Sequence, residues 1–271
     1  MDVSATSKCK RRCRKNDILY GGAGNDTLIG GPGDNTLDGG IGQDTLTGKG
    51  GLDDGTGSID FTNYYGEYGI NTFIIRAGDG GPSIDSADVI TDFEDNNDLI
   101  GMADGLEYSQ LTIEQGTGDY ANHVVVKKTD TGEFLVIIQN INVSNVTYSD
   151  LVSTSTEAQT LTGTSGDDVI LGGSGNDTVT SGVGEDIIIG YSGNDSITIN
   201  GAGNKTVDGG PGTDSLTINY GSISSLNDFA IDRSGDYTSF TDGDGNQILF
   251  KNIETIIIGG KSYVGVYDGV A

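Results

Sequence analysis

The sequence contains no tryptophan, one histidine and two cysteines among 271 residues, and only 34% of its residues are hydrophobic. Two cysteines in so long a chain cannot provide a disulfide framework. Cys9 and Cys13 also lack a nearby histidine or further cysteine, whereas a zinc site needs about four ligands. A chain with so little apolar material would be expected to be disordered unless its apolar residues are regularly spaced.

Most motifs of enzymatic chemistry are missing as well. His123 is the only histidine and lies in a predicted strand, so a His-Glu-x-x-His zinc protease site is excluded. The sequence has no Gly-x-Ser-x-Gly nucleophile elbow and no Gly-x4-Gly-Lys-Ser/Thr phosphate loop. Its glycine-rich runs are not followed by a segment of helix length, which argues against a dinucleotide-binding fold. We therefore expect that the chain is not an enzyme.

Positive charge is scarce except at the start of the chain. The formal net charge is −26, with 14 basic and 40 acidic residues. Six of the basic residues and only one acid precede Asp17, so the balance from Asp17 onward is 8 minus 39, or −31. Such an excess repels itself in a compact state and argues against nucleic-acid binding, so the body of the chain requires cations. The basic run with its two cysteines is interpreted as a mobile terminus.

The glycines that the sequence has in abundance follow a nine-residue period. Units begin at Gly21, Gly30, Gly39 and Gly48, and the first reads Gly-Gly-Ala-Gly-Asn-Asp-Thr-Leu-Ile. Glycine permits positive φ and close approach of the backbone to an ion. The sixth residue is a carboxylate or its amide, and an aliphatic residue two positions later alternates with smaller or polar ones, as in a strand buried on one face. Each unit is therefore a turn and a short strand that must stack on its neighbours.

A second block repeats this pattern after a Ser/Thr-rich linker at residues 153–160. Its units begin at Gly163, Gly172, Ser181 and Gly190. The register then slips by one residue, because the position equivalent to Asp195 is reached after ten residues and holds Lys205. The unit from Gly209 restores the pattern.

Both blocks fit the signature Gly-Gly-x-Gly-x-Asp-x-aliphatic-x, and the chain thus resembles the RTX (repeats-in-toxin, or haemolysin-type calcium-binding) family. The resemblance implies an all-β fold of two right-handed parallel β-rolls, in which two nonapeptides form one turn and Ca²⁺ lies between a turn and its equivalent one coil later. On this basis Asp17 would face Asn35, Asp26 would face Asp44, and Asn35 would face Asp53. In the second block, calcium is expected between Asp168 and Asp186 and between Asp177 and Asp195, but is doubtful between Asp186 and Lys205.

The metal-site residues that the resemblance implies are the turn glycines and the acids or amides of the repeats: Asp17, Gly22, Gly24, Asp26, Gly31, Gly33, Asn35, Gly40, Gly42, Asp44, Asp53, Gly166, Asp168, Gly173, Gly175, Asp177, Gly182, Gly184, Asp186, Gly193, Asp195, Gly210, Gly212 and Asp214. Asp88, Asp92 and Asp98 belong to segments that commonly follow such rolls, and they are equally well read as calcium ligands or as loop carboxylates. The pair Asp53 and Asp54 could serve a glycosidase, but its expected calcium role disfavours that reading.

Five regions follow. We expect a basic tail at 1–15, the first β-roll at 16–57, and a β-rich cap with linker at 58–158. The second β-roll is expected at 159–217, and a C-terminal β-rich cap at 218–271 that contains an export signal. In the caps, Val124–Lys127 and Phe134–Ile138 predict a hairpin. Asp242 to Asn246 has the opening of an EF-hand but lacks the following glycine and the final glutamate, so it is better read as a hairpin turn.

The function expected from the resemblance is calcium binding by a secreted structural or interaction protein, with calcium as a folding ligand. No apolar run has the length of a signal peptide or membrane span, and RTX proteins typically leave through type I secretion machinery instead, so the expected location is extracellular. A cell surface or a polysaccharide is the expected kind of partner. Two alternatives stay open: the calcium-binding part of a larger secreted enzyme (a protease, a lipase or a polysaccharide-modifying enzyme), and an adhesin-like or ice-binding surface. The threonine pattern of the second, Thr45-x-Thr47 and Thr178-x-Thr180, is interrupted in other repeats by Ile29, Asp38, Leu171 and Ile189.

Overall fold

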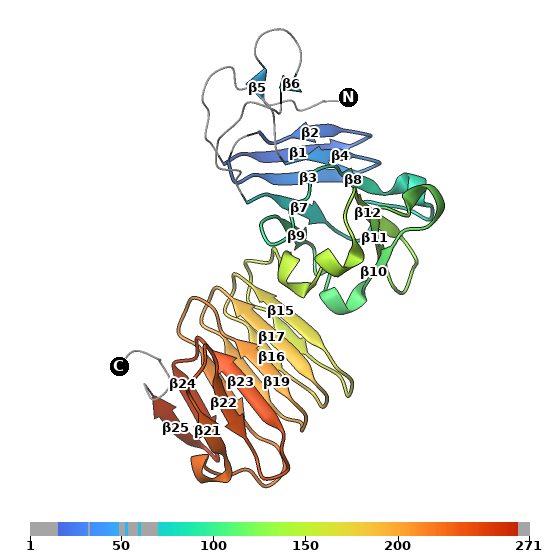
Figure 1. Cartoon of the computed structure of the whole chain (residues 1–271). Helices are drawn as coiled ribbons and strands as arrows, with labels where there is room; N and C mark the ends of the chain where they lie inside the picture. Colours follow the sequence, from blue (N-terminus) through green and yellow to red (C-terminus); the bar gives the residue numbers. More distant parts are fainter. Residues whose placement is uncertain (1–15, 32, 49–51, 54–58, 61–69, 265–271) are drawn as a thin grey trace. The chain divides into compact units, whose positions relative to one another are not determined.

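The computed structural model describes residues 16–31, 33–48, 52–53, 59–60 and 70–264. These residues form an all-β fold with sheets rich in parallel pairs and without an α-helix (Figure 1). None of the helical turns in this part of the chain is long and apolar enough to cross a membrane. The two cysteines, the basic run, Asp54 and the last residues of the expected export signal lie outside the described residues. The chain divides into two compact units: unit 1 contains residues 1–106 and 110–152, and unit 2 contains residues 107–109 and 153–271.

Unit 1 has two main sheets whose strands alternate along the chain. One sheet has the order β1 (Ile18–Ala23), β3 (Thr36–Ile41), β7 (Thr72–Ile75), β9 (Leu99–Met102) and β13 (Leu151–Ser153). The other has the order β10 (Leu111–Gln115), β11 (Val124–Lys128), β12 (Phe134–Ile138), β8 (Asp88–Ile90), β4 (Thr45–Thr47) and β2 (Thr27–Ile29). In this sheet β11 pairs in antiparallel fashion with both β10 and β12, and the pair of β11 with β12 confirms the predicted hairpin.

The register of the parallel pairs shows that two nonapeptides make one coil. Leu19 pairs with Leu37 in one sheet and Leu28 with Leu46 in the other, each eighteen residues apart. Each coil places one apolar side chain per sheet in the interior, and Leu28, Leu37 and Leu46 are fully buried. A three-residue strand alone buries too little to be stable, so the coils depend on stacking.

The repeats alone predict that the stack of coils in unit 1 ends at residue 57. In the structure, the stack continues past this residue. Leu37 of β3 pairs with Phe73 of β7, and Phe73 pairs with Ile100 of β9. The coil that follows Asn35 therefore begins at Asn71, and the expected facing of Asn35 and Asp53 is wrong. Asp53 instead belongs to β5 (Leu52–Asp53), which pairs in antiparallel fashion with β6 (Ile59–Asp60). The reason is that Gly55 stands where the fourth unit needs an aliphatic side chain, so this unit has nothing to add to the core.

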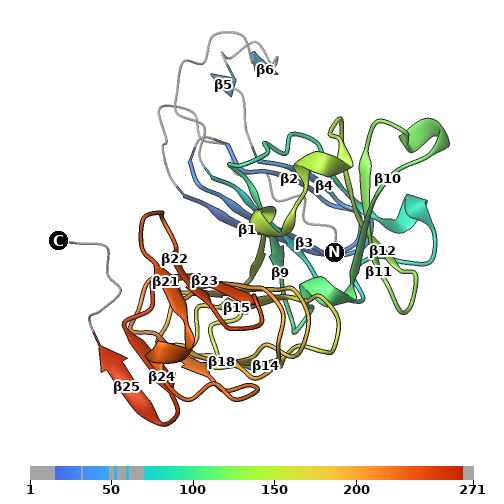
Figure 2. The same cartoon turned by 60° about the horizontal axis from the view of Figure 1, so that its bottom comes forward.

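Unit 2 repeats the arrangement with two six-stranded sheets. One contains β14 (Thr160–Thr162), β16 (Thr178–Thr180), β18 (Ser196–Ile199), β20 (Ser215–Ile218), β24 (Thr255–Ile258) and β25 (Lys261–Val264). The other contains β15 (Val169–Gly173), β17 (Asp186–Tyr191), β19 (Lys205–Asp208), β23 (Gln247–Lys251), β22 (Thr238–Thr241) and β21 (Ala230–Asp232). Figure 2 shows the two sheets as facing layers of this unit, and one apolar cluster fills the space between them.

The parallel ladders of unit 2 extend past residue 217, because β20 pairs with β24 and β19 pairs with β23. Aromatic side chains close the far end of the core: the rings of Phe240 and Phe250 meet edge to face with centroids 5.0 Å apart. The turn from Asp242 to Asn246 joins the antiparallel strands β22 and β23. Asp242 Oδ1 accepts the backbone N–H groups of Asp244 and Asn246 at 2.9 Å each, which confirms the predicted hairpin turn.

The alternation within β17 gives a test of the stacked core. Ile188 is fully buried, whereas Ile189 beside it in the same strand is half-buried. We expect Ile188→Ala to lower the free energy of unfolding by about 2–5 kcal/mol, as truncation of a buried isoleucine does. Chemical denaturation under identical solution conditions checks this, with Ile189→Ala as the matched control. Equal losses in the two variants would contradict the assigned faces.

Candidate metal sites

The glycine turns bring backbone carbonyl groups of successive coils close together. Gly42 has a φ of 145°, and a Cβ there would overlap the carbonyl oxygen of Gly24 in the preceding coil. Gly193 has the same relation to Gly175. Of the glycines that the sequence predicts for the sites, those with positive φ are Gly22, Gly24, Gly31, Gly33, Gly40, Gly42, Gly173, Gly182, Gly184, Gly193 and Gly210, while Gly166, Gly175 and Gly212 are not among them. The turns thus stack with oxygen atoms between them.

A row of aspartates follows each set of turns, and one oxygen of each carboxylate is fixed by the preceding coil. In unit 1, the backbone N–H of Asp26 donates to Asp44 Oδ1 at 2.7 Å. In unit 2, the N–H of Asp177 donates to Asp195 Oδ1 at 2.8 Å, and that of Asp195 donates to Asp214 Oδ1 at 2.7 Å. The expected facing of Asp26 with Asp44 and of Asp177 with Asp195 is therefore present.

The second oxygen of these carboxylates has no hydrogen-bond partner although it is buried. This holds for Oδ2 of Asp26, Asp44, Asp177, Asp186, Asp195 and Asp214. Of these six atoms, Asp186 Oδ2 lies 3.1 Å from a cation of the chain, the Nζ atom of Lys205. Each of the other five atoms lies against the first glycine of its own unit: a Cβ on Gly39 would overlap Asp44 Oδ2, and one on Gly190 would overlap Asp195 Oδ2. A buried anionic oxygen without a donor is costly, because burial removes water and nothing replaces it. A cation is the missing partner.

The pKa values of these carboxyl groups reflect the same lack of hydrogen-bond donors. Burial raises the pKa of the Asp44, Asp177 and Asp195 carboxyl groups above the ordinary value, against the lowering effect of the backbone N–H donors. Burial also raises the pKa of Asp214 to about 6 and that of Asp88 to about 8. Without a cation, folding therefore penalises the ionised form of these carboxylates.

Two predicted site residues, Asn35 and Asp168, are arranged differently. Asn35 uses its amide: Oδ1 accepts the Asp17 N–H at 3.1 Å, and Nδ2 donates to the carbonyl oxygens of Gly31 and Gly33 at 2.9 Å each. A neutral nitrogen donor therefore occupies the position between these carbonyl groups. Asp168 is half-buried, and its Oδ2 accepts the Thr164 N–H at 2.6 Å. Its own N–H donates to Asp186 Oδ1 at 3.1 Å, as the expected facing requires.

The rows of acids are longer than the nonapeptides reveal. Asp44 is followed by Asp88, whose Oδ1 accepts the Asp44 N–H at 3.0 Å. Asn71 is followed by Asp98 at 2.9 Å in the same relation, and Asp214 by Glu254 Oε2 at 2.5 Å. From the sequence alone, Asp88 and Asp98 are equally well read as calcium ligands or as loop carboxylates, and Glu254 is not identified. The signal that could have found it is the tripeptide Glu254-Thr255-Ile256, an acid two residues before a core aliphatic residue, as in Asp26-Thr27-Leu28.

The donor set fits a hard divalent cation. The available atoms are carboxylate oxygens and backbone carbonyl oxygens, the ligands that Ca²⁺ takes in sets of 6–8. Over the described ranges, no group of three or more His, Cys, Asp or Glu side chains converges as a metal site, so backbone carbonyl groups have to complete the coordination. The only histidine, His123, lies just before β11, and its Nδ1 accepts the Asn140 N–H at 3.0 Å.

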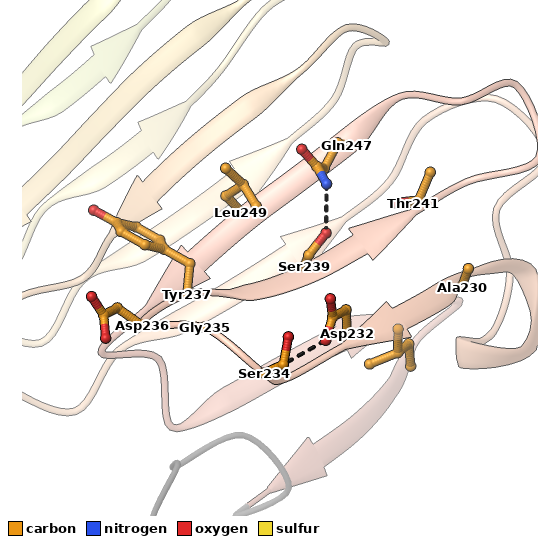
Figure 3. A pocket seen from close by; sticks show the side chains of 11 residues that line it. Ala230, Asp232, Ser234, Gly235, Asp236, Tyr237, Ser239, Thr241, Gln247 and Leu249 are labelled. Atoms are coloured by element: carbon orange, nitrogen blue, oxygen red, sulfur yellow. Dashed lines mark hydrogen bonds between the residues drawn. The ribbon is translucent and has the colours of Figure 1, made fainter.

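A surface hollow on unit 2 is a second place for chemistry. It lies on the face of β21, β22 and β23 that points away from the core, with Asp232, Tyr237 and Gln247 among its eleven lining residues (Figure 3). Gln247 donates to Ser239 Oγ at 2.9 Å. The Ser234 N–H that Asp232 accepts lowers the pKa of Asp232.

Comparison with functionally curated proteins gives no match. Among solved structures, the chain is similar to the R3 subunit of AlgE6, a mannuronan C5-epimerase of Azotobacter vinelandii, with 20% identity over 51% of this chain and 77% of that chain and a TM-score of 0.28. It is also similar to the extracellular lipase LipA of Serratia marcescens, with 18% identity over 87% of this chain, 36% of the lipase and a TM-score of 0.25. The chain thus spans about a third of the lipase's length.

The two glycine-rich blocks match the sequence model of one repeat family. The match covers residues 15–53 and 158–197 in four copies, and the family is described as the RTX calcium-binding nonapeptide repeat. The matched stretches hold the turns in which Asp26, Asp44, Asp177 and Asp195 keep a buried oxygen without a donor. The chain therefore carries RTX calcium-binding nonapeptide repeats at residues 15–53 and 158–197.

Proposed function

We propose that this chain binds calcium ions between the turns of successive coils and that this binding drives its folding. The observation that carries the proposal is the row of buried Oδ2 atoms without a donor at Asp26, Asp44, Asp177, Asp195 and Asp214. Bound calcium would supply the positive charge that these carboxylates lack. Its binding free energy would then become folding free energy, because the rows of ligands exist only when the coils are stacked.

The chain's own residues prepare the sites in two ways. Backbone N–H groups fix the Oδ1 atoms of Asp44, Asp195 and Asp214, which leaves the other oxygen of each carboxylate free for a cation. Glycine at the first position of most units leaves room for the carboxylate, since a Cβ at Gly39 or Gly190 would overlap Oδ2 of Asp44 or Asp195. The donor set of the turns therefore favours ions that bind oxygen ligands. The backbone geometry of the turns requires glycine.

We propose further that the protein acts outside the cell in a structural or interaction role, with a cell surface or a polysaccharide as partner, and that it is not itself an enzyme. Extracellular calcium modules typically bind at about 10⁻⁴ to 10⁻³ M. A chain of that affinity would stay unfolded in the cell, pass through type I secretion machinery and fold on meeting external calcium. The alternative is that these residues form the calcium-binding part of a larger secreted enzyme.

Calcium-driven folding has a direct signature in solution. In excess chelator the full chain should be largely disordered, because fixing each residue costs about 1–2 kcal/mol of backbone entropy and the short strands bury little to offset it. Millimolar calcium should produce a cooperative rise in β-structure measured by circular dichroism. Magnesium should be much less effective, because it demands octahedral geometry and keeps its water. A full β-signal in chelator, unchanged on titration, would refute the proposal.

Acids inside a row should matter more than an acid at the start of one. In unit 2, Asp177, Asp195 and Asp214 follow one another in one row, and Asp168 begins the other row, which continues to Asp186. Asp195 is buried between Asp177 and Asp214, whereas Asp168 is half-buried and already bound by Thr164. Asp214 also lies inside the row, since Glu254 follows it. We expect Asp195→Asn to raise the calcium midpoint of folding about two- to fourfold more than Asp168→Asn, because an interior turn shares ions with both neighbours. The same calcium titration measures this, and similar midpoints in the two variants would contradict the shared-ion arrangement.

The raised pKa values predict the effect of pH on the calcium-free protein. The pKa in the folded state is about 6 for Asp214 and about 8 for Asp88, above the value of 3.8 for an unperturbed aspartate. The folded state then binds more protons than the unfolded state between these values, so its stability rises as pH falls from about 8 toward 4. In chelator, β-structure should increase over this range while calcium affinity decreases. The double variant Asp88→Asn and Asp214→Asn should respond less to pH, and an unaltered response would exclude these two carboxylates as the cause.

A further inference from the structure

Lys205 is the most deeply buried cation in the described part of the chain. It begins β19, is 1% exposed and lies opposite Asp186 in the parallel pairing of β17 with β19. The equivalent position holds an acid in the preceding coil, where it is Asp186, and also in the neighbouring row of repeats. A lysine almost never has this degree of burial unless its charge is compensated.

The ammonium group of Lys205 contacts three oxygen atoms. Its Nζ lies 3.1 Å from Asp186 Oδ2 and donates to the carbonyl oxygen of Ala202 at 3.1 Å and to that of Gly184. Gly184 and Asp186 are the fourth and sixth residues of a repeat, the same two positions that supply the turn carbonyl and the carboxylate elsewhere. Asp186 Oδ2 lacks a hydrogen-bond partner, as do the Oδ2 atoms of the repeat aspartates Asp177 and Asp195, but it forms an ion pair with the ammonium group of Lys205.

The inserted residue of the ten-residue spacing completes the arrangement. The N–H of Asp186 donates to the backbone carbonyl of Asn204 at 3.0 Å. In the regular coils the equivalent N–H donates to a carboxylate, as that of Asp177 does to Asp195. The longer spacing thus supplies a backbone acceptor for the N–H, and the lysine side chain is free to supply the positive charge.

We propose that Lys205 is a built-in cation that occupies a calcium position, so that the turn between Asp186 and Lys205 closes without metal. The inference rests on the proposed calcium binding of the other turns. Unit 2 then has one contact between successive coils that persists at low calcium. The metal-dependent coils on either side can stack from this contact. The second lysine pair of this unit, Lys251 with Asp208 at 3.1 Å, has side chains 37% and 23% exposed and is therefore not equivalent.

The test uses three variants of the full chain. Lys205→Met keeps the apolar stem and removes the charge, Lys251→Met is the matched control, and Lys205→Asp restores the acid of the repeat. A carboxylate with an ion at about 2.4 Å reaches about as far from the Cβ as the lysine ammonium does. Calorimetry gives the number of calcium ions bound, and circular dichroism gives the calcium midpoint of folding.

For Lys205→Met we expect the same number of ions as in the wild type and a midpoint about two- to fourfold higher. Leaving one member of a buried ion pair alone lowers the folding constant by about a hundredfold or more, and this loss is spread over several cooperatively bound ions. Lys251→Met should change the midpoint little, because exposed pairs contribute little. Lys205→Asp should bind one ion more than the wild type.

Two results would overturn the inference. One is a midpoint for Lys205→Met that equals that of Lys251→Met. The other is a number of bound calcium ions in Lys205→Asp that equals that of the wild type. This second result tests the inference even if Lys205→Met does not fold at any calcium concentration. A wild-type chain that binds no calcium would instead remove the proposed function on which the inference rests.

Discussion

The structure depends on how buried carboxylate charge is neutralised. The coils stack because leucine, isoleucine, valine and phenylalanine side chains fill the interior, but the same stacking buries a row of aspartates in each unit. Their Oδ2 atoms are left without donors, and burial raises the pKa of several of them. Apolar packing and charge burial are thus coupled wherever an aspartate occupies the sixth position of a stacked repeat.

The chain meets this constraint in three ways. At Asp26, Asp44, Asp177, Asp195 and Asp214, an Oδ2 atom has no donor, and we propose that Ca²⁺ binds there. At Asn35, a neutral amide donates to the carbonyl oxygens of Gly31 and Gly33. At Asp186, the buried ammonium of Lys205 takes the position of an ion. One repeat frame therefore tolerates a metal ion, an amide or an ammonium between its turns, provided that something donates to the oxygen atoms there.

Much of this could be predicted from the sequence, because the nine-residue period directly encodes the turn, the acid and the core residue. The short, stacked strands follow from it, whereas the parallel ladders and the facing of Asp26 with Asp44 follow from the resemblance to RTX repeats. The continuation of the stacks could not be predicted in the same way. Asn71, Asp88, Asp98 and Glu254 join the rows after insertions of irregular length, so no period marks them. Only the local pattern of an acid two residues before an aliphatic residue remains. The facing of Asn35 and Asp53 was wrong for a related reason: Gly55 removes the core side chain, and the chain leaves the stack.

A crystal structure of the calcium-loaded chain, with ions identified by their anomalous scattering, tests the central claim most directly. The account predicts calcium at the Oδ2 atoms of Asp26, Asp44, Asp177, Asp195 and Asp214, and the Lys205 ammonium without an ion at Asp186 Oδ2. Ordered water in place of calcium at these five oxygens would contradict it. So would an ion at Asp186 Oδ2 with Lys205 displaced into solvent.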